Sequence, residues 1–173
     1  LYGPPGTGKT SLVTALASEL HLNVCTLSLA SPVVTDEKIH TLLAGVPQRS
    51  LLLIEDVDAF FRQRDAAHAQ VRLSFSGFLN ALDGVATQEG NVLFMTTNHA
   101  EQLDPALIRA GRIDERVELG ACDEDQLRRL FLKFRPDEAA ARAYATENAG
   151  QALSPAQVQA DLMRRFGTTP VSA

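Results

Sequence analysis

The chain begins with an octapeptide whose residue types and spacing suit the binding of phosphate groups. Residues 3–10 read Gly-Pro-Pro-Gly-Thr-Gly-Lys-Thr and match the pattern G-x-x-x-x-G-K-[ST] at every fixed position. Glycines allow successive backbone N–H groups to turn inward around phosphate oxygens, and a helix that follows points its partial positive end at the same anion. We expect the loop to bind ATP through Gly3, Pro4, Pro5, Gly6, Thr7, Gly8, Lys9 and Thr10.

Two side chains of this loop have roles of their own. Lys9 is expected to reach the β- and γ-phosphates, and the hydroxyl of Thr10 is expected to ligate Mg²⁺. The alternative is an ordinary turn between a strand and a helix. A helical pattern follows the loop and an acidic strand lies downstream, and both features favour the nucleotide site.

The acidic strand is the second chemical feature. Residues 51–54 are Leu-Leu-Leu-Ile, and Glu55 and Asp56 follow them directly. In open α/β sheets, ligands bind at the carboxyl ends of the strands. One carboxylate is expected to hold Mg²⁺ and the other to orient the attacking water. The residues alone do not decide which of Glu55 and Asp56 takes which role. Asp58 would support the site or a neighbouring subunit.

These groups need a scaffold that brings separate strand ends together. Apolar spacing predicts strands over 24–29, 50–54, 91–97 and 117–119, and helices over 9–20, 36–43 and 75–82. This alternation indicates an α/β fold with a parallel sheet flanked by helices. The first helix is expected to carry Leu12, Leu16 and Leu20 on one face. Asp36 is expected to cap the second helix, and Asp83-Gly84 to end the third.

A phosphate-binding loop must follow a buried strand, and Leu1-Tyr2 is too short to be one. We therefore expect the natural polypeptide to continue upstream, so that this chain is truncated before the first strand of the sheet. Any targeting or membrane segment would lie in that upstream part. Loss of a central strand also predicts poor stability for the isolated piece.

After Gly120 the pattern changes to helices only. Asp123 is a plausible N-cap of a helix that Pro136 ends, a weaker helix covers 137–148, and Ser154-Pro155 opens a helix that stops at Gly167. We therefore predict a nucleotide-binding α/β part over residues 1–120 and a small helical lid over residues 121–173.

Composition and charge exclude few functions, but they argue against nucleic-acid binding, secretion and a metal site built from cysteine or histidine. The formal net charge of −5 argues against a dedicated nucleic-acid surface, so no nucleic-acid partner is expected. Cys25 and Cys122 have no metal-like spacing and suit reduced thiols of a protein that is not secreted. The four histidines share no ligand spacing either.

With these residues in place, the chain resembles the AAA family of ATPases. The resemblance includes the loop 3–10, the acidic strand 51–58, Thr96-Thr97-Asn98, and the stretch 103–114 that reads Leu-Asp-Pro-Ala-Leu-Ile-Arg-Ala-Gly-Arg-Ile-Asp. It implies the P-loop NTPase version of the α/β fold and a ring of identical subunits. It also implies that Asn98 senses the γ-phosphate and that Arg109 and Arg112 reach the nucleotide of the next subunit, where they stabilise developing charge.

A narrower resemblance is to the Bcs-type AAA proteins. It rests on residues 73–85 (Leu-Ser-Phe-Ser-Gly-Phe-Leu-Asn-Ala-Leu-Asp-Gly-Val), on Glu55-Asp56-Val57-Asp58, and on residues 154–159 of the lid. The best-known member is a mitochondrial inner-membrane chaperone. That member moves the folded Rieske iron–sulfur protein across the membrane and so completes respiratory complex III. The resemblance implies that location, that protein cargo, and a membrane anchor upstream of Leu1.

Two departures from the wider family bear on function. Most AAA motors have Asp before Glu at the acidic strand end, whereas this chain has Glu55 before Asp56. In register with that family, the resemblance implies Glu55 at the metal position and Asp56 at the water-orienting position, although the two acids could divide these roles differently. Residues 30–34 also lack the aromatic residue with which threading motors grip an unfolded chain, which fits a folded cargo. Two alternatives stay open: another AAA machine, such as a membrane-protease motor or a disassembly ATPase, and a nucleotide-gated scaffold with negligible turnover.

Overall fold

A three-stranded parallel sheet organises the first part of the molecule. The computed structural model describes residues 1–60, 72–85, 90–109 and 112–167, so the polar loop predicted over 62–70 lies outside the described residues. Within these ranges the strands are β1 (Asn23–Ser28), β2 (Ser50–Glu55) and β3 (Val92–Met95), in the order β1-β2-β3. The predicted α/β fold with a parallel sheet of the P-loop NTPase type is confirmed.

The beginning of the chain pairs with two other segments. Tyr2 forms parallel bridges with Thr97 and with Glu118, and its N–H donates to the carbonyl of Val117 at 3.0 Å. The strand expected over 117–119 is therefore a single bridge in the described structure. What precedes Leu1 stays a prediction.

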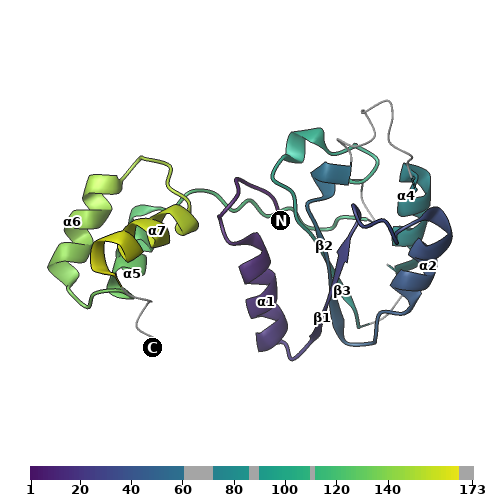
Figure 1. Ribbon diagram of the computed structural model, residues 1–173, viewed down its shortest axis with the longest axis horizontal. Coiled ribbons are helices and arrows are strands. Elements are labelled where there is room, and N and C mark those ends of the chain that lie inside the picture. The colour runs from purple at the N-terminus through teal and green to yellow at the C-terminus, as the bar shows by residue number, and fades with distance from the viewer. Residues whose placement is uncertain (61–71, 86–89, 110–111, 168–173) are drawn as a thin grey trace. The chain divides into compact units, whose positions relative to one another are not determined.

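Helices cover both faces of this sheet (Figure 1). Helix α1 (Lys9–Glu19) lies on one face, and helices α2 (Asp36–Ala44) and α4 (Phe75–Val85) lie on the other. Alternate residues of β2 enter the two cores: Leu51 and Leu53 join the α1 side, and Leu52 and Ile54 join the α2–α4 side. The unbroken apolar run in β2 follows from burial on both faces.

Helix α1 packs on the sheet with a face other than the one that Leu12, Leu16 and Leu20 share. Val13 and Ala17 are buried, whereas Leu20 is 54% exposed. Lys9 is buried too, and the three buried residues follow one another at intervals of four, which places them on one side of the helix. The face of helix α1 that contains Lys9 thus packs toward the sheet. The leucines at positions 12, 16 and 20 lie on a neighbouring face of the helix.

Two predicted helix boundaries were wrong. Asp36 is the first residue of α2 instead of its cap, and its carboxylate accepts hydrogen bonds from the N–H and the hydroxyl of Ser74 at 2.7 and 3.1 Å. Helix α4 does not end at Asp83-Gly84 but continues to Val85. An interior glycine costs a helix only about 1 kcal/mol, which tertiary contacts easily override.

The chain divides into two compact units. One contains Leu1–Tyr2 and Lys9–Glu118, and the other contains Gly3–Gly8 with the residues from Leu119 onward. The second unit has three helices among its described residues, α5 (Glu124–Leu132), α6 (Glu138–Asn148) and α7 (Pro155–Phe166). They enclose a core of their own, built from Leu127, Phe131, Ala141, Tyr144, Ala145, Val158 and Leu162.

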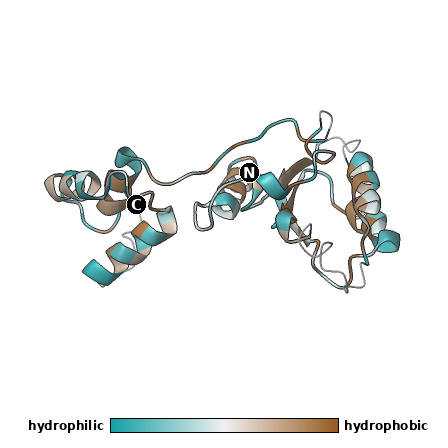
Figure 2. Cartoon of the chain, turned by 90° about the horizontal axis from the view of Figure 1, so that it is seen from above, coloured by the Kyte–Doolittle hydropathy of each residue, from teal (hydrophilic) through white to brown (hydrophobic). Residues whose placement is uncertain are grey.

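Hydropathy varies along every helix (Figure 2). The longest described helix, α7, has 12 residues. Among the described residues we find no helix with the length and apolar character needed to cross a membrane.

The predicted caps of the second unit are confirmed. Asp123 and Ser154 each accept a hydrogen bond from the N–H three residues later, and Gln126 and Gln157 return bonds to the cap N–H groups. Both helices therefore begin with a capping box.

We expect the Ser154→Ala variant to destabilise the start of α7 by about 1 kcal/mol, because the N–H of Gln157 loses its acceptor. Amide hydrogen exchange at residues 156–158 measures this local loss. Ser154→Gly is the matched control, since glycine at an N-cap costs only a few tenths of a kcal/mol. Equal exchange in the alanine variant and the parent protein would contradict the assignment.

Candidate nucleotide-binding site

Three predicted site residues meet at the carboxyl ends of β2 and β3. The ammonium of Lys9, in the first turn of α1, donates to Oδ1 of Asn98 at 2.7 Å. The amide Nδ2 of Asn98 in turn donates to Oδ1 of Asp56 at 3.3 Å. A cation, an amide and a carboxylate are thus connected in series at one edge of the sheet, although they come from distant parts of the sequence.

Beside this series lies the predicted metal pair. The hydroxyl of Thr10 donates to Oε1 of Glu55 at 2.8 Å. Both groups offer hard oxygen atoms, the ligands that Mg²⁺ prefers, and the two oxygens are already adjacent. Thr10 and Glu55 therefore fit the magnesium ion that the sequence predicts.

The environment of Lys9 is unusual for a lysine. Only 8% of the residue is exposed. Burial lowers the pKa of its ammonium, and the negative charges of Asp56 and Asp58 partly oppose that shift. The ammonium has lost much of its water and faces two carboxylates, so a phosphate group that arrives meets a cation with little hydration to displace.

Asp58 has a clearer role than the sequence indicated. Its side chain is fully buried, and Oδ1 accepts from the hydroxyl of Thr97 at 2.8 Å and from the N–H of Asn98 at 3.2 Å. Asp58 therefore fixes the backbone from which the Asn98 side chain extends. The position of Asp58 just after the acidic strand was a signal in the sequence, but its partners Thr97 and Asn98 follow another strand, β3.

The backbone at Asp56 takes a left-handed conformation, with φ of 49°. The N–H of Asp56 donates to the hydroxyl of Thr96 at 3.2 Å, and the next N–H, of Val57, donates to the Thr96 carbonyl at 3.0 Å. The chain thus leaves β2 in a sharp turn that the neighbouring strand holds. Few residues other than glycine adopt this conformation, and they are concentrated at functional sites.

The glycines of the phosphate loop are required by its shape. Gly3 has φ of 137°, and a Cβ at that position would collide with the backbone carbonyl of Leu119. Gly6 has φ of 79°, and its Cβ would lie 3.0 Å from Cβ of Ala156. The carbonyl of Gly6 also accepts a hydrogen bond from the N–H of Ala156 at 3.1 Å. Residues 3–8 therefore pack closely within their own unit, and any side chain at Gly3 would disturb that packing.

The two predicted arginines differ in their surroundings. Arg109 is exposed, and its side chain makes no hydrogen bond or ion pair among the residues that the structure describes. The guanidinium of Arg112 is engaged by Asp83, with Nε–Oδ1 and Nη2–Oδ2 distances of 2.8 and 2.9 Å. The sequence predicted the same role for both, and it gave no signal for the partner Asp83.

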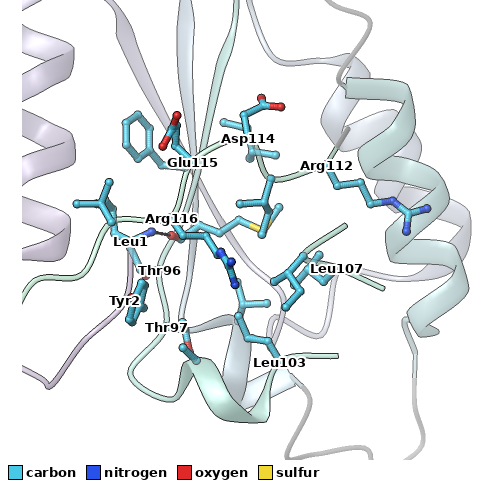
Figure 3. A pocket seen from close by; sticks show the side chains of 18 of the residues that line it. Leu1, Tyr2, Thr96, Thr97, Leu103, Leu107, Arg112, Asp114, Glu115 and Arg116 are labelled. Carbon is cyan, nitrogen blue, oxygen red and sulfur yellow. Dashed lines mark hydrogen bonds between the residues drawn. The ribbon is translucent and has the colours of Figure 1, made fainter. Parts of the chain in front are cut away.

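A groove of about 600 Å³ lies along β3 (Figure 3). Residues of β3, the segment Asp114–Val117, and Leu1 line it. The backbone nitrogen of Leu1 donates to the carbonyl of Met95 at 2.7 Å inside the groove. Lys9, Asn98 and Asp56 do not line the groove, whereas Thr96 and Thr97, which bond to Asp56 and Asp58, do. The groove therefore adjoins the strand ends that hold the site, but the charged groups near Lys9 do not face it.

Comparison with known proteins agrees with the geometry. Residues 1–121 match the model of the ATPase family associated with various cellular activities (AAA). The chain is 47% identical over its whole length to the mitochondrial chaperone BCS1 of Homo sapiens and covers 44% of that protein. It is 48% identical to the mitochondrial chaperone BCS1 of Bos taurus, with 94% of this chain and 42% of the relative covered. A probable mitochondrial chaperone BCS1-B of Dictyostelium discoideum is 42% identical over the same shares.

The chain therefore spans less than half the length of the curated relatives it matches. The family model covers the phosphate loop, the acidic strand, Asn98 and both arginines. The match to the BCS1 proteins extends through the helical second unit as well. The chain belongs to the AAA family of ATPases, and within that family it is similar to the BCS1 chaperones along its full length.

Proposed function

We propose that the chain hydrolyses ATP to ADP and phosphate in a magnesium-dependent reaction. The observation that carries this proposal is the connected series Lys9–Asn98–Asp56, with the Thr10–Glu55 pair beside it. The amide of Asn98 contacts both the ammonium of Lys9 and the carboxylate of Asp56, and from there it can contact both the γ-phosphate and a water molecule.

In the proposed mechanism, backbone N–H groups of the loop 3–8 and the ammonium of Lys9 bind the phosphates. Lys9 then exchanges Asn98 for phosphate oxygens. Thr10 and Glu55 would hold Mg²⁺, which supplies neutralisation of charge on the β- and γ-phosphate oxygens. Asp56 and Asn98 orient a water molecule for attack on the γ-phosphorus, and the bond from phosphorus to the ADP oxygen breaks.

The proposal includes a ring of identical subunits. Arg109 is exposed, and its side chain makes no hydrogen bond or ion pair with the part of the chain that the structure describes, so it is suited to act on the nucleotide of a neighbour. An arginine supplied in this way stabilises charge on the transferring phosphoryl group and is worth about 10³–10⁵ in turnover. The sequence predicted the same action for Arg112. The guanidinium of Arg112, however, is bound to Asp83, so the two arginines are not in equivalent positions to act.

We further propose that the whole protein is a mitochondrial inner-membrane chaperone. The names of the relatives support a mitochondrial chaperone. The inner membrane and the cargo, the folded Rieske iron–sulfur protein of complex III, rest on the resemblance to Bcs-type proteins alone. Val33 is 60% exposed in the segment where threading motors carry an aromatic residue, which suits a folded cargo.

The decisive experiment measures ATP turnover by the full-length protein and by two variants, Asp56→Asn and Arg109→Ala. Each variant alone is expected to lose at least about 100-fold in turnover. A mixture of the two is expected to recover about a quarter of the parental rate in randomly assembled rings. Recovery occurs because one subunit keeps the water-orienting acid and its neighbour keeps the arginine.

Other outcomes point to the alternatives. A parent protein that binds ATP without measurable turnover contradicts the motor and leaves the nucleotide-gated scaffold. Turnover without recovery in the mixture contradicts the action of Arg109 across a subunit boundary. Turnover with recovery, but with no effect of ATP on the Rieske protein, leaves another AAA machine as the function.

A further inference from the structure

We propose that Asp83 is a positioning residue for ATP hydrolysis, which it affects through Arg112 and the turn that presents Arg109. In this assignment Arg112 does not act on the neighbour's nucleotide. It fastens the exposed turn to helix α4, and Arg109 alone reaches out. The inference rests on the proposed function, because a trans-acting arginine has meaning only for a ring ATPase.

The first observation is the geometry of the guanidinium. Nε and Nη2 of Arg112 donate to the two carboxylate oxygens of Asp83 at 2.8 and 2.9 Å, and Nη1 donates to the carbonyl of Ala106 at 2.8 Å. All three nitrogens are therefore used within one chain. A bidentate arginine–carboxylate pair is among the strongest and most directional hydrogen-bonded contacts in proteins.

The second observation is the direction of the side chain. Figure 3 shows Arg112 extended away from the groove and toward α4, the helix that carries Asp83. Only 21% of the Arg112 side chain is exposed. The contacts with Asp83 and Ala106 engage three of the five N–H groups of Arg112 within its own chain and hold the guanidinium beside α4.

The third observation concerns the turn itself. Leu107 is fully buried in the core, and its N–H donates to the carbonyl of Asp104 at 2.9 Å. The N–H of Arg112 donates to the carbonyl of Arg109 at 3.2 Å, so the two arginines are joined through the backbone. Arg112 thus connects Arg109, Ala106 and α4, while the Arg109 side chain stays exposed.

The place of Asp83 supports the same reading. Asp83 lies in the last turn of α4, where the helix dipole disfavours a negative charge. The hydrogen bonds from Arg112 nevertheless lower the pKa of this carboxyl. Arg112 therefore stabilises the ionised form of Asp83 at a helix end that disfavours negative charge.

The test uses the full-length protein with Asp83→Asn. Turnover at saturating ATP is expected to fall about 10- to 100-fold, because a displaced catalytic group loses about that much for a misplacement near 1 Å. KM for ATP is expected to stay within about two-fold, since the arginine acts on the transition state. Asp125→Asn is the matched control: Asp125 also accepts from two arginines, Arg128 at 2.9 Å and Arg129 at 2.8 Å, and it lies outside the proposed machinery.

Rings assembled from two different variants show on which side of the subunit boundary Asp83 acts. A mixture of Asp83→Asn with Asp56→Asn is expected to recover activity, because the second subunit supplies an intact Arg109 turn. A mixture of Asp83→Asn with Arg109→Ala is expected to stay inactive, because every subunit then has a defective arginine side. Recovery in this second mixture would overturn the proposal.

A charge exchange separates positioning from direct catalysis. The double variant Asp83→Arg with Arg112→Asp restores an ion pair between the turn and α4. We expect it to turn over ATP at least several-fold faster than either single exchange. If the double variant stays as inactive as Arg112→Asp alone, Arg112 contacts the neighbour's nucleotide directly and the proposal fails. Absence of turnover in the parent protein defeats the proposed function itself, whereas parental turnover in Asp83→Asn defeats only this inference.

Discussion

A Lys9→Met variant of the full-length protein is expected to lose ATP binding by at least about 1,000-fold and to show no measurable turnover. Lys9 is the cation of the series that ends at Asp56, and it is buried with both Asp56 and Asp58 nearby. Methionine keeps most of the length of the side chain but carries no charge. A triphosphate that enters the loop then faces two carboxylates with no cation between them.

Equilibrium binding of a fluorescent ATP analogue, followed by a turnover assay, measures both losses. Lys38→Met is the matched control, because Lys38 is exposed on α2 and lies outside the proposed site. The control is expected to bind and hydrolyse ATP at parental levels. If Lys9→Met binds the analogue within ten-fold of the parent, the phosphates do not meet this lysine and the site is misassigned.

Asp58→Ala is expected to destabilise the strand ends of the site by about 2–4 kcal/mol. The alanine leaves the buried Thr97 hydroxyl and the N–H of Asn98 without the oxygen that accepts both. This chain contains no tryptophan, so amide hydrogen exchange is the suitable probe. Exchange at residues 96–99 is expected to become about 30- to 1,000-fold faster.

Two controls give this prediction its specificity. Thr97→Val removes one of the two donors and is expected to cost about 1 kcal/mol. Asp56→Asn alters an exposed carboxylate and is expected to abolish turnover while it leaves exchange at residues 96–99 near the parental rate. Parental exchange in Asp58→Ala would mean that Asp58 does not support Asn98.

Much of the site could be predicted because its residues stand at fixed places in a known kind of scaffold. Parallel strands that end at one edge bring together whatever follows them, and the AAA resemblance had already assigned both Asp56 and Asn98 to the nucleotide site. The capping boxes at Asp123 and Ser154 were equally local, since each depends on residues three apart. The roles of these site residues in catalysis stay predictions.

Other features depended on distant contacts that no local pattern records. The pair Asp83–Arg112 joins residues 29 positions apart, and Asp83-Gly84 reads locally as a helix end. The buried face of α1 was missed for a related reason. A leucine stripe indicates the core in most helices, but here the need to aim Lys9 at the strand ends sets the rotation of the helix.

The left-handed backbone at Asp56 gives a reason for the unusual order of the two acids. Aspartate tolerates this conformation better than longer side chains do, because its short carboxyl can bond to the local backbone. A transplanted Asp-Glu order would place glutamate on that strained turn. The handedness of the backbone at this one residue therefore makes glutamate a costlier choice than aspartate at position 56 of this chain, and an exchange of the two acids is expected to strain the turn.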